Sequence, residues 1–236
     1  MIKASKRGFC EDDKRWFSNK EIIRLKKAQE EIRYLIDRDY KMIPVVTFVG
    51  DRYQFSTRQR DALKRATCTS EKVLCRKNKI LSIDKIKEGS IYIDGFNLII
   101  TIEVALSKGT LILCDDENIR DIAGLRGTYK IIDKTDIALD IIGRFLEDVK
   151  AKEVVIYLDS PVSNSGKLKS KIMSYAENWN FNTQVELVNN ADVILEKLDR
   201  VVSSDSVVID KCANYFNLNK CIINKYIKSA ELINLS

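Results

Sequence analysis

Acidic side chains follow several of the apolar, β-branched runs in the second half of the chain. Asp94 closes such a run in GSIYIDGFNLII (residues 89–100), and Asn97 comes three residues later. Further acids follow later runs: Asp115 and Asp116 after TLILC, Asp159 after EVVIYL, and Asp205 after VVSS. Because residues that follow parallel strands gather at one edge of the sheet, we expect these carboxylates to converge there.

Converging carboxylates repel one another unless they take up protons, pair with cations or share a metal ion. The chain contains no histidine, which excludes Ser-His-Asp triads, histidine general bases and H-E-x-x-H zinc sites. Its six cysteines form no C-x-x-C pair, so a zinc site is not expected. No P-loop or G-x-G-x-x-G motif is present either. Any enzymatic chemistry must then use carboxylates, lysines, hydroxyls or thiols, and the combination that forms most easily is a carboxylate with a hard cation such as Mg²⁺.

The elements that must position these acids begin near residue 90, where apolar runs alternate with helix-like stretches. We expect strands in SIYI, TLILC, EVVIYL, TQVELV, SSDSVVI and KCIIN, and helices over 97–107, 117–124, 134–150, 164–178, 191–199 and 208–217. This alternation predicts a mainly parallel α/β sheet covered on both faces. An Asp between a strand and a helix is also a common N-cap, so the metal interpretation depends on the whole set of acids.

Residues 1–70 are predicted to form a basic, all-helical region. Apolar residues at 22, 25, 28, 32, 35 and 36 indicate an amphipathic helix over 20–38. Ser56 and Gln59 fit a capping box before a helix over 57–68. That helix carries the cations Arg58, Arg60, Lys64 and Arg65, which leaves open a helix-turn-helix or a surface that contacts a nucleic-acid backbone. We expect residues 71–89 to be a connector with a small hairpin and residues 90–236 to be the α/β domain.

The two parts differ in charge. Residues 1–90 contain 23 Lys and Arg against 13 Asp and Glu, a net charge of +10, and residues 91–236 contain 17 against 21, a net charge of −4. A basic part suits a polyanion and an acidic part suits cations, although solvated surface charge is the alternative. Three lysines after Asp159 are further candidates for holding a nucleic-acid backbone: Lys167, Lys169 and Lys171. Arg120 and Arg126 flank the acidic element DDENIRDIAG and are alternative partners for its acids.

Neither a membrane span nor a signal peptide is indicated. No apolar run approaches the ~20 residues that cross a bilayer. The N-terminal segment MIKASKRGFCEDDKRWF lacks an apolar core. We therefore expect no membrane association and a cytoplasmic location.

The strand-end motifs resemble those of PIN-like and NYN ribonuclease domains. IYIDGFNLI is similar to their first motif, VVIYLDSPVS to a later strand-Asp element, and VVSSDSVVID to their terminal Ser/Thr-Asp motif. Over almost its whole length, the chain also resembles an archaeal family of unknown function. The segments that carry this second resemblance are RGFCEDDKRWF, VGDRYQFSTRQR, DGFNLIITIE, LCDDENIRDIAG and SSDSVVID.

The PIN-like resemblance implies a three-layer α/β/α sandwich over residues 90 to about 223, whose acidic cluster binds Mg²⁺ or Mn²⁺ and cleaves RNA. It implies Asp94 as the central metal ligand beside Asn97, Asp159 and Asp205 as further ligands, and Asp210 as support for a second metal. The second acid of that family has no matching position here, and we choose Asp116, with Asp115 beside it as another ligand.

We therefore expect a metal-dependent nuclease that acts on RNA. The alternative is a non-catalytic RNA-binding protein with a degenerate acidic edge. A phosphatase of the haloacid-dehalogenase type is disfavoured, because DGFN lacks the second Asp two residues after the first.

Overall fold

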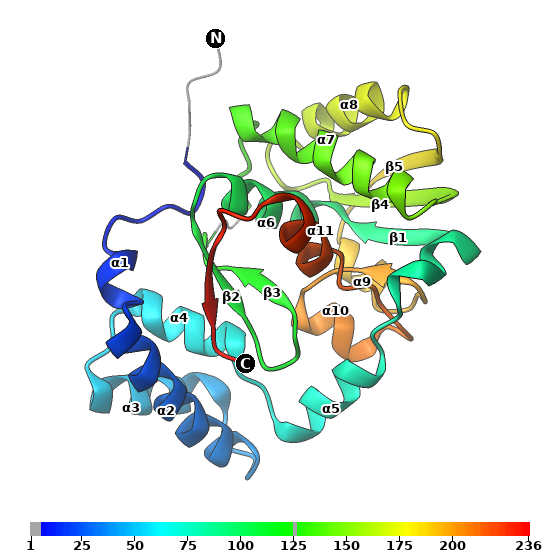
Figure 1. Ribbon diagram of the computed structural model, residues 1–236. Coiled ribbons are helices and arrows are strands. Elements are labelled where there is room, and N and C mark those ends of the chain that lie inside the picture. The colour runs from blue at the N-terminus through cyan, green and yellow to red at the C-terminus, as the bar shows by residue number, and fades with distance from the viewer. Residues whose placement is uncertain (1–5, 125–126) are drawn as a thin grey trace.

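The computed structural model describes residues 6–124 and 127–236, and it has a mixed α/β fold (Figure 1). The strands are β1 (Ile91–Asp94), β2 (Thr110–Leu113), β3 (Ile119–Asp121), β4 (Glu153–Asp159), β5 (Asn182–Val188), β6 (Val201–Val202) and β7 (Glu231–Asn234). The helices are α1 (Asp13–Trp16), α2 (Asn19–Ile36), α3 (Met42–Tyr53), α4 (Thr57–Ala66), α5 (Ser70–Asn78), the 3₁₀ helix η1 (Ile83–Glu88), α6 (Gly95–Leu106), α7 (Asp133–Asp148), α8 (Ser165–Ala176), α9 (Ala191–Leu195), α10 (Ser206–Lys211) and α11 (Leu218–Tyr226). Among the described residues, none of these helices combines the length and hydropathy that a bilayer crossing requires.

The main sheet has four parallel strands in the order β5-β4-β1-β6. From β1 the chain moves outward to β4 and β5, and it then returns to add β6 on the other side of β1. The strand order therefore reverses between β1 and β6. In open parallel sheets, ligands bind in the crevice at the carboxyl ends of the strands beside such a reversal.

Helices cover both faces of this sheet, as the prediction from alternating elements required. Successive side chains of β1 enter two different hydrophobic cores, one on each face of the sheet. Ile91 and Ile93 pack with α6, α7, α8 and α11 on one face. Tyr92 packs with α9 and α10 on the opposite face. The period of two along the strand fixes which side chains enter each core. The short helices α9 and α10 thus lie on one face, directly after the strands β5 and β6.

A second sheet, with the order β3-β2-β7, joins the N-terminal helices to the rest of the molecule. On one face, Leu111 and Ile119 enter the core that contains α6. On the other face, Ile112 and Leu235 pack with buried side chains of α2, α3 and α4, such as Leu25. The basic helical region therefore shares a hydrophobic core with the C-terminal strand, which holds it against the α/β part.

The predicted helix starts in the N-terminal region agree with the structure. Helix α2 buries Leu25 and Ile32 on its apolar face. The capping box before α4 is present: the Ser56 N–H donates to Gln59 Oε1 at 2.9 Å, and the Gln59 N–H donates to Ser56 Oγ at 3.3 Å. Satisfying these free N–H groups fixes where the cationic helix begins.

Four sequence predictions were wrong. Residues 71–89 contain α5 and η1 in place of a hairpin, and the expected helix over 117–124 contains β3. SSDSVVI and KCIIN, expected to be strands, form α10 and α11. In α11, Leu218, Ile222 and Ile223 lie on one buried helical face, so burial outweighs the β preference of isoleucine.

Candidate active site

Asp94 lies at the end of β1 and is buried. Its Oδ1 accepts a hydrogen bond from the Asn97 N–H at 3.1 Å, which caps α6, and its Oδ2 accepts one from the Ser203 hydroxyl at 2.9 Å. Gly95 permits a close approach between the start of α6 and β4, because a Cβ there would lie 2.6 Å from the Leu158 side chain. The backbone of α6 thus begins in close contact with β4, and this contact fixes the position of Asp94.

Four aspartates at the carboxyl edge of the main sheet interact electrostatically: Asp192 interacts with the other three, and Asp94 also interacts with Asp205. We call Asp94, Asp159, Asp192 and Asp205 the edge acids. Burial, together with the charges of Asp192 and Asp205, raises the pKa of Asp94 to about 7. Burial and then the charges of Asp205, Asp159 and Glu196 raise the pKa of Asp192 to about 6. These mutual effects follow from like charges held close together in a partly buried place.

Asp192 is the member of this group that the sequence analysis missed. It lies in the first turn of α9, four residues beyond the last residue of β5, so it does not follow its strand directly. The available signal was the segment VELVNNAD, in which Asn190 caps α9 and places an acid in its first turn. Such an acid is ordinarily explained by the helix dipole alone.

Three edge acids also accept hydrogen bonds from the first turns of helices. Asp94 and Asp205 are the N-caps of α6 and α10, as the alternative interpretation held, and Asp159 accepts from the first N–H of α9. Asp159 Oδ1 accepts a hydrogen bond from the Ala191 N–H at 2.8 Å, and Asp205 Oδ1 accepts one from the Val207 N–H at 2.7 Å. Within the described ranges, the second oxygen of each, and both oxygens of Asp192, accept no hydrogen bond. Capping leaves these oxygens free for a cation.

Asn97 ties helix α6 to the loop after β6. Its Oδ1 accepts hydrogen bonds from the backbone N–H and the hydroxyl of Ser204, both at 2.9 Å. The Asn219 amide lies 3.5 Å from the same oxygen. Because Oδ1 is fully used in this way, Asn97 holds the loop that carries Asp205.

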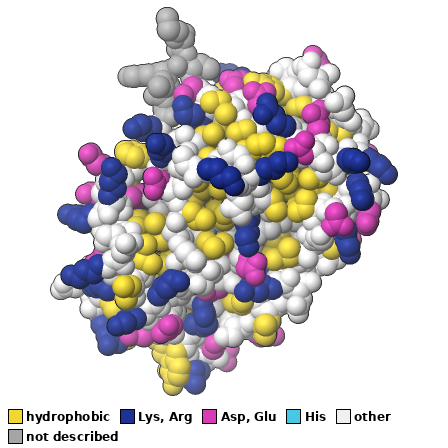
Figure 2. All heavy atoms as spheres, viewed as in Figure 1, with side chains coloured by type: hydrophobic (Ala, Val, Ile, Leu, Met, Phe, Trp, Pro, Cys, Tyr) yellow, Lys and Arg dark blue, Asp and Glu magenta, His cyan; other side chains and the backbone are white. Residues whose placement is uncertain are grey.

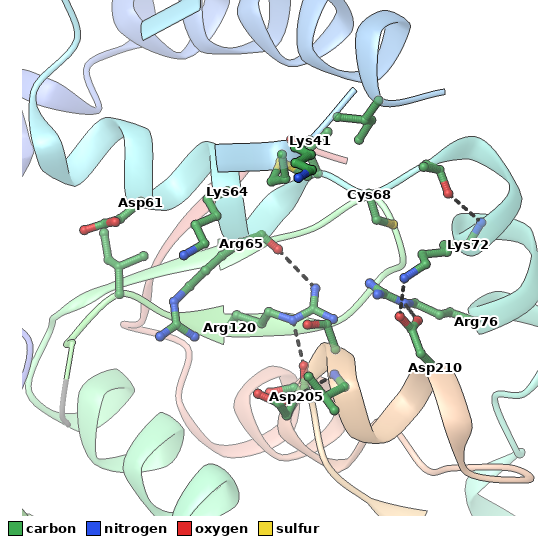
Figure 3. A pocket seen from close by; sticks show the side chains of 18 of the residues that line it. Lys41, Asp61, Lys64, Arg65, Cys68, Lys72, Arg76, Arg120, Asp205 and Asp210 are labelled. Atoms are coloured by element: carbon green, nitrogen blue, oxygen red, sulfur yellow. Dashed lines mark hydrogen bonds and ion pairs between the residues drawn. The ribbon is translucent and has the colours of Figure 1, made fainter. Parts of the chain in front are cut away.

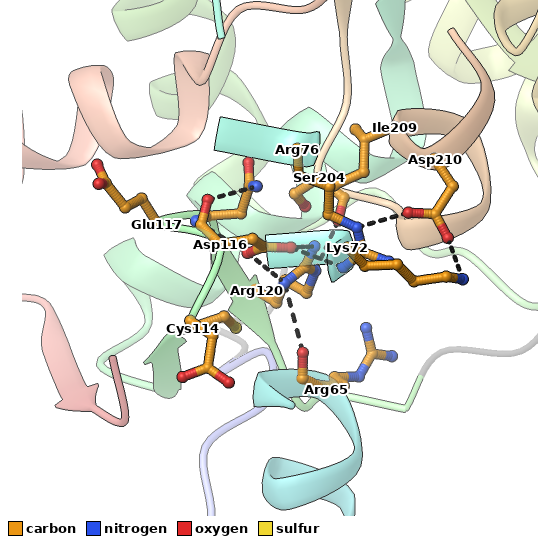
Figure 4. Close-up of polar contacts among 12 residues, drawn as sticks. Arg65, Lys72, Arg76, Cys114, Asp116, Glu117, Arg120, Ser204, Ile209 and Asp210 are labelled. Carbon is orange, nitrogen blue, oxygen red and sulfur yellow. Dashed lines mark hydrogen bonds and ion pairs between the residues drawn. The ribbon is translucent and has the colours of Figure 1, made fainter. Parts of the chain in front are cut away.

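Asp116, our choice for the second acid, lies in a different environment (Figure 4). Its oxygens accept hydrogen bonds from Arg120 at 2.9 and 2.7 Å and from Arg76 at 2.8 Å. Burial opposes ionisation, but the two guanidinium groups outweigh it and lower the pKa of Asp116 to about 2. We correct that choice, since both oxygens of this carboxylate are occupied by cations.

Asp115 and Asp210 are also paired with cations away from the edge acids. Asp115 accepts hydrogen bonds from Arg33 and, at 3.0 Å, from Gln29. Asp210 accepts them from Arg76 at 2.6 Å and Lys72 at 2.7 Å. The structure therefore brings Asp94, Asp159 and Asp205 together and leaves Asp115, Asp116 and Asp210 in ion pairs. Arg120 pairs with Asp116, as the alternative held, and Arg126 lies outside the described residues.

A cleft of about 760 Å³ separates the N-terminal helices from the loop after β6 (Figure 3). One side is lined by Lys41, Lys64, Arg65 and Lys72, and the other by Asn97, Ser204, Asp205 and Val207. The cleft thus opens directly beside an edge acid. On the face seen in Figure 2, Lys and Arg side chains are scattered among acidic ones, so the excess positive charge does not form one continuous patch there.

Only some of the cations predicted to contact nucleic acid line this cleft. Lys64 and Arg65 line it, whereas Arg58 and Arg60 form ion pairs and hydrogen bonds with other residues of the protein. Arg58 forms an ion pair with Asp13 at 2.6 Å and donates to the Gly8 and Ile122 carbonyls. Arg60 donates to the Phe55 and Thr47 carbonyls and to Asp51.

The three lysines after Asp159 belong to α8, which packs on the face of the sheet opposite to α9 and α10. None of Lys167, Lys169 and Lys171 lines the cleft. Lys171 forms an ion pair with Asp136 of α7 at 2.6 Å. The geometry therefore does not bring these lysines to the edge acids through the cleft.

The donor chemistry of the edge acids fits a hard cation, with one restriction. Among the described residues, no three Asp, Glu, Cys or His side chains are grouped closely enough to hold one metal ion. Mg²⁺ keeps several waters and is commonly held by one or two carboxylates together with substrate phosphates. The free oxygens of Asp159, Asp192 and Asp205, with the raised pKa values of Asp94 and Asp192, suit such a partly hydrated ion.

Comparison with known proteins supports the whole-chain resemblance. Residues 83–221 match the family described as "Domain of unknown function (DUF5616)", and residues 24–79 match "Protein of unknown function (DUF434)". The chain is 35% identical over 185 residues to "Uncharacterized protein MJ0935" of Methanocaldococcus jannaschii, and the alignment covers 78% of this chain and 88% of that protein. No solved structure matches the chain. The resemblance to an archaeal family of unknown function is confirmed.

Proposed function

The chain belongs to the DUF5616 family, and we propose that it is a metal-dependent nuclease that hydrolyses phosphodiester bonds in RNA at the edge acids. The observation that carries this proposal is the electrostatic interaction of four carboxylates, one at or after the end of each parallel strand, beside the reversal of strand order. Burial and then their mutual repulsion raise the pKa values of Asp94 and Asp192, and a divalent cation would relieve the repulsion.

The proposal includes a PIN-like fold for residues 90 to about 223. Its support is the parallel order β5-β4-β1-β6, the helices on both faces, and the recurrence of Asp at the strand ends. Asp192, in α9 after β5, adds a fourth acid that the sequence analysis did not name. The support for a PIN-like fold therefore comes from the geometry of this chain.

The edge acids divide between two roles in the proposed site. Asp94, Asp159 and Asp205 would hold Mg²⁺ or Mn²⁺, while Asp192 adds negative charge beside them. When bound, such an ion lowers the pKa of a coordinated water and neutralises charge that develops on phosphate oxygens. The hydrogen bond from Ser203 fixes the position of Asp94, and the hydrogen bonds from Ser204 to Asn97 fix the loop before Asp205. The protein thus positions the proposed metal ligands by its own contacts.

Cleavage of labelled RNA with Mn²⁺ or Mg²⁺ tests the proposal. Asp94→Asn and Asp159→Asn should each abolish cleavage while the fold survives, because asparagine keeps the shape and the capping oxygen. Asp140→Asn is the matched control, since it removes the charge of an exposed aspartate on α7. Wild-type protein that leaves RNA intact with both metals would contradict the proposal.

A second candidate is a non-catalytic RNA-binding protein. It is favoured by the absence, among the described residues, of three carboxylates grouped around one point and by the cations that line the cleft. Calorimetric titration with Mn²⁺ separates the two candidates. Binding that disappears in Asp94→Asn favours the nuclease, whereas RNA binding without any binding of Mn²⁺ favours the second candidate.

A further inference from the structure

One wall of the cleft is formed by the N-terminal helical region. Lys41 precedes α3, and Lys64 and Arg65 lie in the last turn of α4. Figure 3 shows Lys64 and Arg65 projecting from α4 on one side of the cleft and Asp205 on the other. We call Lys41, Lys64 and Arg65 the cationic wall. A ligand that reaches Asp205 through the cleft lies against it.

The cationic wall is free to bind an anion. All three side chains are exposed, and in the part of the chain that the structure describes none has a carboxylate partner. The other two cations of the same helix, Arg58 and Arg60, are held by carbonyls and carboxylates. Two exposed acids, Asp39 and Asp61, also line the cleft and reduce its positive charge. Over all the charged residues that line the cleft, six cations against four acids leave a net charge of +2, which suits a phosphate backbone.

The size and the apolar lining of the cleft limit what enters it. Its volume of about 760 Å³ is within the range of sites that hold small molecules, about 300–1,000 Å³. Tyr40 and Val207, 60% and 49% exposed, line it together with Met42. Aromatic and apolar side chains beside cations provide stacking surface for unpaired bases. A duplex has no bases free to use this surface.

We propose that the N-terminal helices form a phosphate-binding wall that holds an extended single strand of nucleic acid across the cleft. The phosphates contact Lys41, Lys64 and Arg65, and unpaired bases lie against Tyr40 and Met42. This inference rests on the proposed nuclease function, since it leads the strand to Asp205. It gives the basic N-terminal region a role in selecting unpaired substrate.

Binding of a short fluorescein-labelled RNA strand, followed by fluorescence anisotropy in EDTA, tests the inference without cleavage. The wild-type protein should bind the strand at least tenfold more tightly than a duplex of the same sequence. Lys64→Glu with Arg65→Glu should weaken binding at least tenfold. The slope of log K against log salt is negative, and its magnitude should be smaller by about 1.4 in this double variant. Each contact with a single-strand phosphate contributes about 0.7, and the variant removes two such contacts.

Lys150→Glu with Lys152→Glu is the matched control. These lysines are exposed and lie before β4, at the edge of the sheet opposite to the edge acids. The control should bind like the wild type, and circular dichroism should show both double variants folded. Equal weakening by the two pairs, tighter binding of the duplex, or unchanged binding by the Lys64 and Arg65 variant would overturn the inference. Cleft-dependent binding without cleavage under any metal would support the inference while contradicting the nuclease.

Discussion

The Ser203 hydroxyl donates a hydrogen bond to Oδ2 of Asp94 at 2.9 Å, across 109 positions of sequence. Ser203 directly follows β6 and Asp94 is the last residue of β1, the two strands beside the reversal of strand order. The same hydroxyl accepts a hydrogen bond from the Asp205 N–H at 3.0 Å. One small side chain therefore links two edge acids and sets their relative position.

The raised pKa of Asp94 predicts how the stability of the metal-free protein depends on pH. Burial and neighbouring acids raise this pKa from 3.8 to about 7, so the folded state binds the proton more tightly than the unfolded state does. The stabilisation from this proton is complete below about pH 4 and is lost as the pH rises through about 7. At about pH 8, Asp94→Asn should be more stable than the wild type, by on the order of 4 kcal/mol.

Urea denaturation in EDTA across this pH range measures the difference between the two proteins. Below about pH 4 the two free energies of unfolding should approach each other. Added Mn²⁺ should stabilise the wild type at about pH 8 and leave Asp94→Asn unchanged, because only binding to the folded state stabilises it. A difference between the proteins that does not vary with pH would contradict the assignment of this pKa.

Asp192 should be functional although it caps no helix. Asp192→Asn removes one of the charges that repel Asp94, and it replaces one of the two free carboxylate oxygens of Asp192 with an amide nitrogen that cannot bind a cation. We expect metal affinity and cleavage to fall about 10- to 100-fold, as for groups that support a metal ligand. The measurements are Mn²⁺ calorimetry and RNA cleavage, with Asp140→Asn as the control. Unchanged values for Asp192→Asn would exclude it from the site.

The buried ion pairs of Asp116 should contribute to stability. Removal of one partner of a buried pair leaves an uncompensated charge and costs about 3–5 kcal/mol. Asp116→Asn and Arg120→Met should each lower the free energy of unfolding by about that amount, and the double variant should cost less than the sum. Urea denaturation of the three variants checks this. Additive effects would show that the two side chains are not coupled.

Arg120 also donates to the Ser204 carbonyl at 2.7 Å, so this network reaches the loop that precedes Asp205. Arg76 joins it to Asp210 of α10 at 2.6 Å. Asp116 and Asp210, which we expected to bind metal, thus stabilise the loop and the helix on either side of Asp205.

Gly95 should not tolerate a side chain. A Cβ there would lie 2.6 Å from the Leu158 side chain and 2.7 Å from that of Ile156, inside a packed core. Gly95→Ala should therefore cost about 1–3 kcal/mol, as overpacking does. Gly166→Ala in α8 is the matched control, because no atom lies within 4 Å of its added Cβ. Thermal denaturation should show a loss for the first variant and none for the second.

Local patterns in the sequence were sufficient to predict part of the fold. The capping box at Ser56 and the helical period of α2 depend on residues within one turn of each other, so both were recognised. The strand-end positions of Asp94, Asp159 and Asp205 follow from parallel topology. These features need no knowledge of long-range contacts.

Features set by tertiary contacts were not recognised. The pairing of Asp116 with Arg76 joins residues 40 positions apart, and nothing near either residue indicates it. Asp192 enters the group of edge acids because α9 turns back over the sheet after β5. The β-branched residues of α10 resemble a strand until the buried face of the helix is known.

A crystal grown or soaked with Mn²⁺ and measured for anomalous scattering tests the central claim most directly. We predict an Mn²⁺ ion at the edge acids, with Asp94 and Asp205 among its ligands, and no ion there in Asp94→Asn. Mn²⁺ bound only elsewhere, or an edge without any ion at a saturating concentration, would contradict the account.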